Sequence, residues 1–280
     1  MRNFFLFICS FFLLMSSTYS QDSILIKENT LSTWELLKYD GVSAFNGLTT
    51  TYTRPLQWKK DDFITAGAIV LGTGALYLID DDAKKWFGTQ EKNVPDVIKE
   101  FGWYFGNPQN VYAAHGALYL YGLFTKNEKI RKTGVLLLSA VSTAGLIQTI
   151  SKTATGRSRP GNNEGKGKFK PFSKEGVYHS FPSGHTILSV TTAYAIAKQF
   201  DNPFVKAGIY GVGMITPLSR IWAGAHWLSD VGLSIAISVL VVETIDTYLN
   251  EERDYGKKPQ NKISWKLNVG LGQVGITGSF

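Results

Sequence analysis

The sequence has almost no cysteine, and its one thiol falls in a segment that is expected to be removed. Cys9 is the only cysteine among 280 residues, and it lies in an apolar run over 4–15. Arg2 before this run and small residues after it are typical of a secretory signal peptide, here over 1–20. The mature chain would then contain no thiol, which excludes disulfides, cysteine nucleophiles and thiolate metal sites. An uncleaved N-terminal anchor is the alternative.

Charged residues are also scarce. They make up 18% of the chain, and hydrophobic residues make up 44%. Soluble domains average about 25% charged residues, so this composition excludes intrinsic disorder. The net charge is +7, and it is concentrated: residues 152–174 contain seven Lys or Arg and one acid, Glu164. This concentration predicts electrostatic focusing of an anionic ligand. The sequence contains no basic helix and no aromatic platform motif, the features that would indicate a nucleic-acid-binding protein.

The middle of the chain contains helix-length apolar segments and no alternating strand pattern. Six segments stand out, over 63–79, 111–124, 134–150, 184–199, 204–218 and 228–249. Small residues recur along them and allow close helix packing. Residues 263–280 alternate apolar and polar side chains, which predicts a short β-hairpin packed on the domain. The predicted fold class is therefore all-α, an antiparallel helical bundle of about six core helices with a short C-terminal β-hairpin.

The same features predict a division of the chain into four parts. These are a signal peptide over 1–20, an N-terminal segment over 21–60, a helical-bundle domain over 61–252 and a C-terminal tail over 253–280. Whether the helices cross a membrane stays open. A span needs about 20 apolar residues, and several segments are shorter than this. The alternatives are a bundle that lies in or against a membrane and a chain whose early segments do not span it.

Three short motifs follow one another at the ends of these segments. The first is Lys152 with Arg159-Pro160, and the second is Pro182-Ser183-Gly184-His185. The third is Ser219-Arg220 with His226 and Asp230. In an antiparallel bundle, the ends of the segments that carry these motifs share one side, so we expect the motifs to converge.

The residue types in these motifs suit phosphate chemistry. His226 and Asp230 are four residues apart, so on one helix the carboxylate can orient the imidazole and leave its other nitrogen nucleophilic. Lys152, Arg159 and Arg220 supply cations for phosphate oxygens. Backbone N–H groups at Ser183 and Gly184 begin a helix, where its dipole favours an anion.

With all three motifs present, the sequence resembles the type 2 phosphatidic acid phosphatases. These enzymes share a helical fold and an active site with bacterial class A acid phosphatases and vanadium haloperoxidases, and the resemblance covers about 60–250. It implies that His226 is the nucleophile that forms a phosphohistidine, that Asp230 orients it, and that His185 protonates the leaving oxygen and then activates water. Lys152, Arg159, Ser183, Gly184 and Arg220 would bind the phosphoryl group.

We therefore expect a metal-independent phosphatase without a cofactor, with vanadate as an inhibitor. Its expected substrate is a phosphomonoester or pyrophosphate, most plausibly of a lipid at a membrane surface: phosphatidate, polyprenyl diphosphate or a lipid A phosphate. The expected location is the periplasm or envelope of a Gram-negative-type bacterium, with no obligate protein partner. A vanadate-dependent haloperoxidase and a non-catalytic lipid-phosphate binding protein are the alternatives.

Several residues outside the motifs allow two interpretations. His115 is expected in the core or at the site rim, and His179 in a solvated loop or near the site. Arg157 either assists the phosphate cradle or lines its loop. The Lys-rich stretch 166–174 is a solvated loop or a substrate-capture segment, and 126–132 is expected to be an exposed turn.

Overall fold

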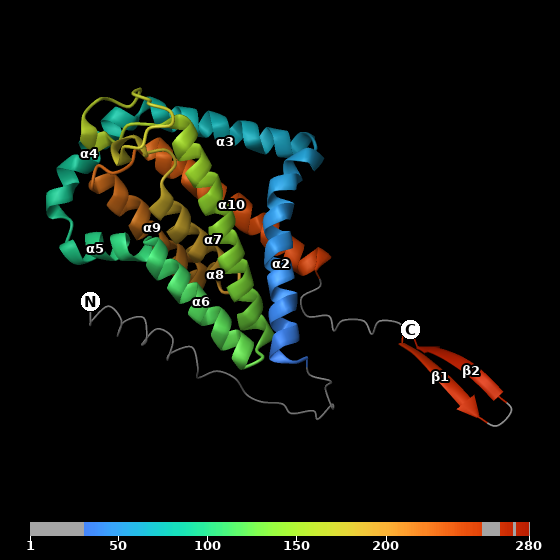
Figure 1. Cartoon of the computed structure of the whole chain (residues 1–280). Helices are drawn as coiled ribbons and strands as arrows, with labels where there is room; N and C mark the ends of the chain where they lie inside the picture. Colours follow the sequence, from blue (N-terminus) through green and yellow to red (C-terminus); the bar gives the residue numbers. More distant parts are fainter. Residues whose placement is uncertain (1–30, 254–263, 271–272, 280) are drawn as a thin grey trace. The chain divides into compact units, whose positions relative to one another are not determined.

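The described part of the computed structural model is built almost entirely from helices (Figure 1). It comprises residues 31–253, 264–270 and 273–279. The predicted signal peptide over 1–20, with Cys9, lies outside these residues. The α-helices are α2 (Thr33–Thr53), α3 (Lys60–Leu78), α4 (Asp80–Gln90), α5 (Asp96–Phe105), α6 (Pro108–Phe124), α7 (Glu128–Thr155), α8 (Gly184–Ala197), α9 (Pro203–Trp222) and α10 (Leu228–Thr247).

Short elements complete the chain. Four 3₁₀ turns, η1 to η4, span Arg54–Gln57, Glu91–Asn93, Pro160–Asn162 and Gly176–Tyr178, and a π-helical turn, η5, spans Tyr248–Glu252. Strands β1 (Ser264–Gly270) and β2 (Gln273–Ser279) pair antiparallel, with Leu267 opposite Ile276. They lie in the segment for which the sequence predicts a hairpin. Its packing on the helical domain stays a prediction.

Each of the six predicted segments contains a helix, and the all-α class is correct. The structure also has helices that the sequence did not predict, namely α2, α4 and α5. The count of about six core helices is therefore not confirmed. The run over 126–132 is not simply an exposed turn, because α7 begins at Glu128 and Arg131 is 6% exposed. The Arg131 Nε lies 2.9 Å from Asp40 Oδ2, so this buried cation pairs α7 with α2.

The main hydrophobic core lies where α7, α8 and α10 meet. Leu136, Leu137 and Ala140 of α7 pack there with Ile187 of α8 and with α10 and η5. Small residues allow these helices to approach closely, and the pattern extends to α2, where a Cβ at Gly47 would lie 3.2 Å from the Ile245 side chain. The core thus holds rigidly the helices whose ends carry the motifs.

Helix α3 is apolar yet has no buried residue. Its exposed side chains include Val70 and Leu71, at 69% and 76% exposure. Its Leu76 contacts α10 at Gly232. By length and composition, α3, α7 and the segment Leu228–Glu252 could each cross a membrane, with mean hydropathies of 1.2, 1.6 and 1.8. Such an apolar, unburied surface is expected for a helix that faces lipid.

Helix ends are set by local sequence signals. The Asn107, Asn127 and Asn202 side chains accept backbone N–H groups at the starts of α6, α7 and α9. Helix α7 ends at Thr155, and the next residue, Gly156, has a left-handed φ of +58°, as is typical after a helix C-terminus. The Lys170 carbonyl packs so closely against this glycine that a Cβ would lie 1.8 Å from its oxygen. Gly156 therefore fixes the path of the chain into the first motif.

We predict that Gly156→Ala will lower the free energy of unfolding by about 1–3 kcal/mol, because alanine disfavours the left-handed conformation and its Cβ clashes. The thermal midpoint of detergent-purified protein measures this loss. Gly208→Ala in α9 is the matched control, since a Cβ there meets nothing within 4 Å. An unchanged midpoint for Gly156→Ala would contradict the assignment.

Candidate active site

The C-terminal ends of α7 and α9 and the N-terminal ends of α8 and α10 meet at the loop that joins α7 to α8. This loop is drawn in yellow in Figure 1. The Arg159 Nη1 donates to the Ala225 carbonyl at 3.2 Å, which joins the first motif to the third. The Ser183 N–H donates to Ser234 Oγ at 2.8 Å, which joins the second motif to α10, the helix that carries Asp230 of the third. The structure therefore brings the three motifs together, as the topology predicted.

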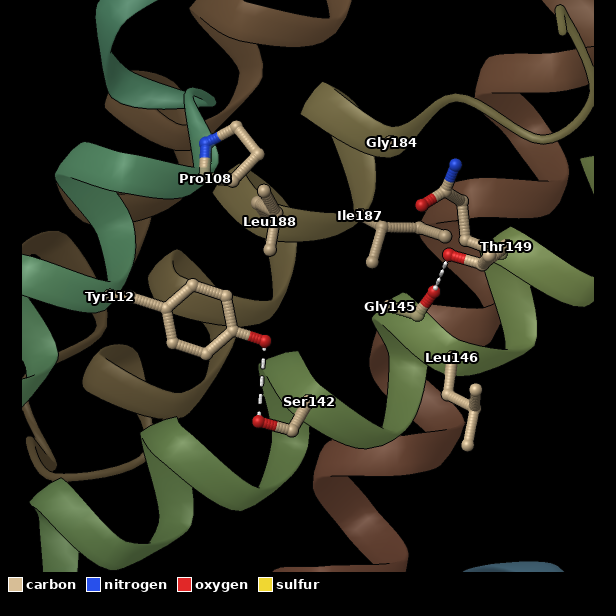
Figure 2. A pocket seen from close by; sticks show the side chains of 10 residues that line it. Pro108, Tyr112, Ser142, Gly145, Leu146, Thr149, Gly184, Ile187 and Leu188 are labelled. Atoms are coloured by element: carbon tan, nitrogen blue, oxygen red, sulfur yellow. Dashed lines mark hydrogen bonds between the residues drawn. The ribbon is translucent and has the colours of Figure 1, made fainter.

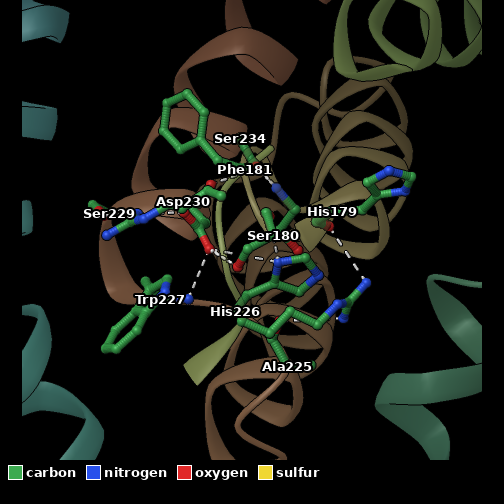
Figure 3. A network of polar contacts seen from close by, with 12 residues as sticks. His179, Ser180, Phe181, Ala225, His226, Trp227, Ser229, Asp230 and Ser234 are labelled. Carbon is green, nitrogen blue, oxygen red and sulfur yellow. Dashed lines mark hydrogen bonds and ion pairs between the residues drawn. The ribbon is translucent and has the colours of Figure 1, made fainter. Parts of the chain in front are cut away.

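His226 is buried just before α10, which begins at Leu228, and its orientation is fixed by the backbone. Its Nδ1 lies 2.7 Å from the Ser180 carbonyl oxygen, a hydrogen-bond distance, and 3.7 Å from Asp230 Oδ2 (Figure 3). A carbonyl only accepts, so Nδ1 carries the proton and Nε2 has a free lone pair. The sequence attributed this orientation to Asp230 alone and missed the carbonyl, since a backbone group leaves no mark in residue types.

Asp230 is fully buried and is held through both carboxylate oxygens. Its Oδ2 accepts from Ser180 Oγ at 2.5 Å and from the Trp227 N–H at 2.8 Å (Figure 3). Its Oδ1 accepts from Arg157 Nη1 at 2.6 Å. Ser180 therefore binds Asp230 with its hydroxyl and His226 with its carbonyl. The carboxylate acts on the imidazole through Ser180 and through its charge.

Arg157 belongs to this hydrogen-bond network, because its guanidinium binds two carboxylates. Its guanidinium is 1% exposed, and its Nη2 donates to Asp80 Oδ2 at 2.7 Å. Asp80, at the start of α4, also accepts from the Ser229 N–H at 2.9 Å and from Ser229 Oγ at 2.6 Å. Neither interpretation of Arg157 from the sequence included this pairing. Asp80 itself was missed because nothing distinguishes it from the acids that follow it.

Among the residues that the structure describes, the three predicted phosphate cations form no ion pair with a carboxylate. Lys152 and Arg159 lie near enough to Asp230 to interact with its charge, and Arg220 interacts in the same way with Arg159. The Arg159 guanidinium also donates to the Gly176 carbonyl, and Arg220 stacks on Trp103 at 4.8 Å. Burial, and then the charge of Arg159, lower the pKa of Arg220 to about 10. Crowded, partly buried cations of this kind favour an anion between them.

Burial is the main cause of the lowered pKa of both motif histidines, and the nearby cations add to it. Burial lowers the pKa of His226 to about 4, and Asp230 only partly opposes this. Burial, and then the charge of Arg220, lower the pKa of His185 to about 3. The His185 Nε2 is buried without a hydrogen-bond partner, and its ring lies 4.7 Å from that of Trp103. An anion placed between these cations would raise both pKa values.

Ser183 caps α8, because its Oγ accepts from the Thr186 N–H at 3.4 Å. Its own N–H is bound to Ser234, so it is engaged within the protein. Gly184 follows it and also lines a cavity of about 320 Å³ (Figure 2). The walls of this cavity come from α6, α7 and α8: Pro108, Tyr112, Ser142, Gly145, Leu146, Gln148, Thr149, Gly184, Ile187 and Leu188. A largely apolar space thus adjoins the start of the second motif.

Of the other histidines and the Lys-rich stretch, His115 lies apart from the site, whereas His179 and Lys166 border it through their backbone carbonyls, which accept from Arg159 and Arg157. His115 is a core residue, 4% exposed, with Nε2 3.1 Å from Thr192 Oγ1. His179 is half-buried, with Nε2 2.7 Å from the Ser173 carbonyl. Lys166 donates to the Leu78 carbonyl at 2.8 Å, so part of the Lys-rich stretch is tied to the end of α3. Within the described residues, no group of three His, Cys, Asp or Glu side chains could hold a metal ion.

Comparison with known proteins matches residues 133–252 to the PAP2 superfamily. A lipid A 1-phosphatase of Rhizobium etli is 30% identical over 201 residues, covering 65% of this chain and 81% of that protein. A lipid A 4'-phosphatase of Porphyromonas gingivalis is 28% identical, covering 44% of this chain and 54% of that protein.

A solved structure, that of Aquifex aeolicus LpxE, aligns with a TM-score of 0.44 at 19% identity, covering 59% of this chain and 94% of that one. Two findings assign the family: the Rhizobium etli protein is matched over most of its length, and the family match includes all three motifs. The chain is a phosphatase, a phosphoric ester hydrolase that belongs to the PAP2 superfamily.

Proposed function

We propose that this chain removes phosphate from a phosphorylated lipid through a phosphohistidine formed on His226. The observation that carries the proposal is the hydrogen bond of His226 Nδ1 to the Ser180 carbonyl at 2.7 Å, because it leaves Nε2 as the nucleophilic nitrogen. Burial keeps the imidazole neutral, since it lowers the pKa of His226 to about 4. A neutral, oriented imidazole beside a cluster of cations is the arrangement that attack on phosphorus requires.

The reaction would proceed in two displacements. In the first, binding of the phosphate anion raises the pKa of His185, which takes up a proton. Nε2 of His226 then attacks phosphorus, the bond between phosphorus and the lipid oxygen breaks, and His185 donates its proton to that oxygen. In the second, water attacks phosphorus, His185 takes its proton, and the bond between phosphorus and Nε2 breaks. Lys152, Arg159 and Arg220 would balance the charge on the phosphoryl oxygens in both transition states, and Gly184 would add its N–H. No step requires a metal ion.

Asp230 would stabilise the imidazolium that forms when His226 is phosphorylated. Its Oδ2 lies 3.7 Å from Nδ1, close enough for a strong charge interaction in a buried site. The other carboxylate contacts keep that oxygen in place. This role explains why a full carboxylate is buried beside a ring that the backbone already orients.

A lipid substrate is supported by three observations. The two relatives reported above act, by their names, on lipid A. The cavity of about 320 Å³ beside Gly184 is lined mainly by apolar side chains and could accept part of an acyl chain. Helix α3 presents an apolar surface without buried residues. Together these observations favour a lipid A phosphate, or a related envelope lipid phosphate, at the membrane surface of the cell envelope.

The first test measures phosphate release from lipid A, phosphatidate, a polyprenyl diphosphate and an aryl phosphate by the full chain in detergent. We expect the lipids to be hydrolysed with the higher kcat/KM, and His226→Ala to abolish release from all of them. Gly145→Phe, which would fill the cavity, should raise KM for the lipid by about tenfold and leave the aryl phosphate unaffected. Gly145→Ala is the matched control. Equal turnover of lipid and aryl phosphate by every variant would contradict a lipid substrate.

The second test is the pH dependence of kcat/KM. Only neutral His226 is a nucleophile, so activity is lost as pH falls through its pKa, which burial lowers from 6.5 to about 4. The acidic limb should therefore lie below pH 6.5. Asp230→Asn removes a negative charge that favours the protonated ring, so it should move the limb to lower pH while it reduces kcat by at least about tenfold.

Ionisation of the substrate phosphate affects wild type and variant equally, so the difference between their profiles is the measurement. A limb that moves to higher pH in Asp230→Asn would contradict the proposed role of this carboxylate.

A further inference from the structure

We infer that Asp80, which lies outside all three motifs, is a positioning residue for the nucleophile: through Arg157 it fixes the carboxylate of Asp230 against His226. The inference rests on the proposed function and adds a component from α4. Its observation is a continuous buried chain of contacts from Asp80 Oδ2 to Arg157 Nη2 at 2.7 Å, and from Arg157 Nη1 to Asp230 Oδ1 at 2.6 Å. All three side chains are at most 1% exposed.

The planar guanidinium of Arg157 links the positions of the two carboxylates, Asp80 and Asp230. A single fork reaches Asp80 with one terminal nitrogen and Asp230 with the other, and its Nε donates to the Lys166 carbonyl at 3.1 Å. Because the fork is rigid, the position of Asp80 sets the plane of Arg157 and so the place of Asp230 Oδ1. With Oδ1 held, Oδ2 can only face Ser180 and His226.

Asp80 is itself fixed at two further points. Its oxygens accept from the N–H and the hydroxyl of Ser229, in the first turn of α10. The positive end of a helix attracts a carboxylate, so this contact holds Asp80 in place. The rings of Tyr77 and Trp227 cover the Arg157 guanidinium at 5.0 and 5.4 Å, which excludes water from the pairs. The start of α10, which carries Asp230, is thereby tied to the start of α4.

The charge balance also favours a role beyond packing. A buried ion pair is expensive to desolvate, and apolar side chains could fill the same space at no loss of stability. Arg157 is shared between two carboxylates, so the cluster has a net negative charge next to His226. This negative charge offsets the repulsion that the surrounding cations would exert on the imidazolium of His226. Asp80 supplies half of the negative charge.

The test compares two inhibitors of the full chain in detergent. Vanadate bonds to the nucleophilic nitrogen and mimics the transition state, whereas inorganic phosphate needs only the cations. Asp80→Asn keeps the shape of the side chain and removes its charge. We expect its inhibition constant for vanadate to rise about tenfold or more, with the constant for phosphate within about twofold of wild type, and its kcat to fall with little change in KM.

Two variants keep the result interpretable. Asp82→Asn makes the same charge change on the exposed side of α4 and should change neither constant. Ser229→Ala removes only the hydroxyl that bridges Asp80 and Arg157. It should therefore raise the inhibition constant for vanadate by a smaller factor. If Asp80→Asn does not fold, Ser229→Ala provides the test.

Parallel changes in both constants, or none, in Asp80→Asn and Ser229→Ala would overturn the inference while leaving the proposed function intact. Wild-type protein that releases phosphate but is not inhibited by vanadate would overturn both, because attack by His226 would then be wrong.

Discussion

The buried guanidinium of Arg157 is the interaction on which the rest of this site depends. It lies between Asp80 and Asp230, at 2.7 and 2.6 Å, in a place without access to water. Removing one member of such a buried cluster leaves an uncompensated charge, so each of the three side chains needs the others to remain buried as a stable ion. Their positions fix the junction of α4, the loop after α7 and the start of α10. The helical core holds these elements, and the ion cluster sets their register.

Because this junction is fixed, the site has one side that carries carboxylates and another that carries cations. On one side the carboxylates surround Arg157, and on the other Lys152, Arg159 and Arg220 form the cationic side. His226 lies at the boundary, with its Nδ1 bound to the Ser180 carbonyl. Phosphate charge would be balanced by the cations, and the imidazolium charge by the carboxylates. The arrangement is preorganised, so little reorganisation is needed when charge moves from substrate to histidine.

The sequence predicted the helical class and the three motifs, and it missed the contacts that hold the motifs in place. Helix-length apolar runs located α3 and α6 to α10, and the three motifs located side chains that the structure brings together around His226. It missed α4 and α5, which are short and mixed in composition, and α2, which lies in a segment without a strong apolar run. It also missed Asp80 and the Ser180 carbonyl. One looks like an ordinary solvated acid and the other is backbone, so only tertiary packing reveals their partners.

The central claim is that His226 becomes covalently phosphorylated through its Nε2. It is tested most directly by quenching the full chain during turnover of a phosphate-labelled lipid and mapping the labelled peptide. The account predicts an acid-labile, alkali-stable phosphohistidine on the peptide that contains His226, absent in His226→Ala. Turnover without any such adduct, or a label on His185 instead, would contradict it.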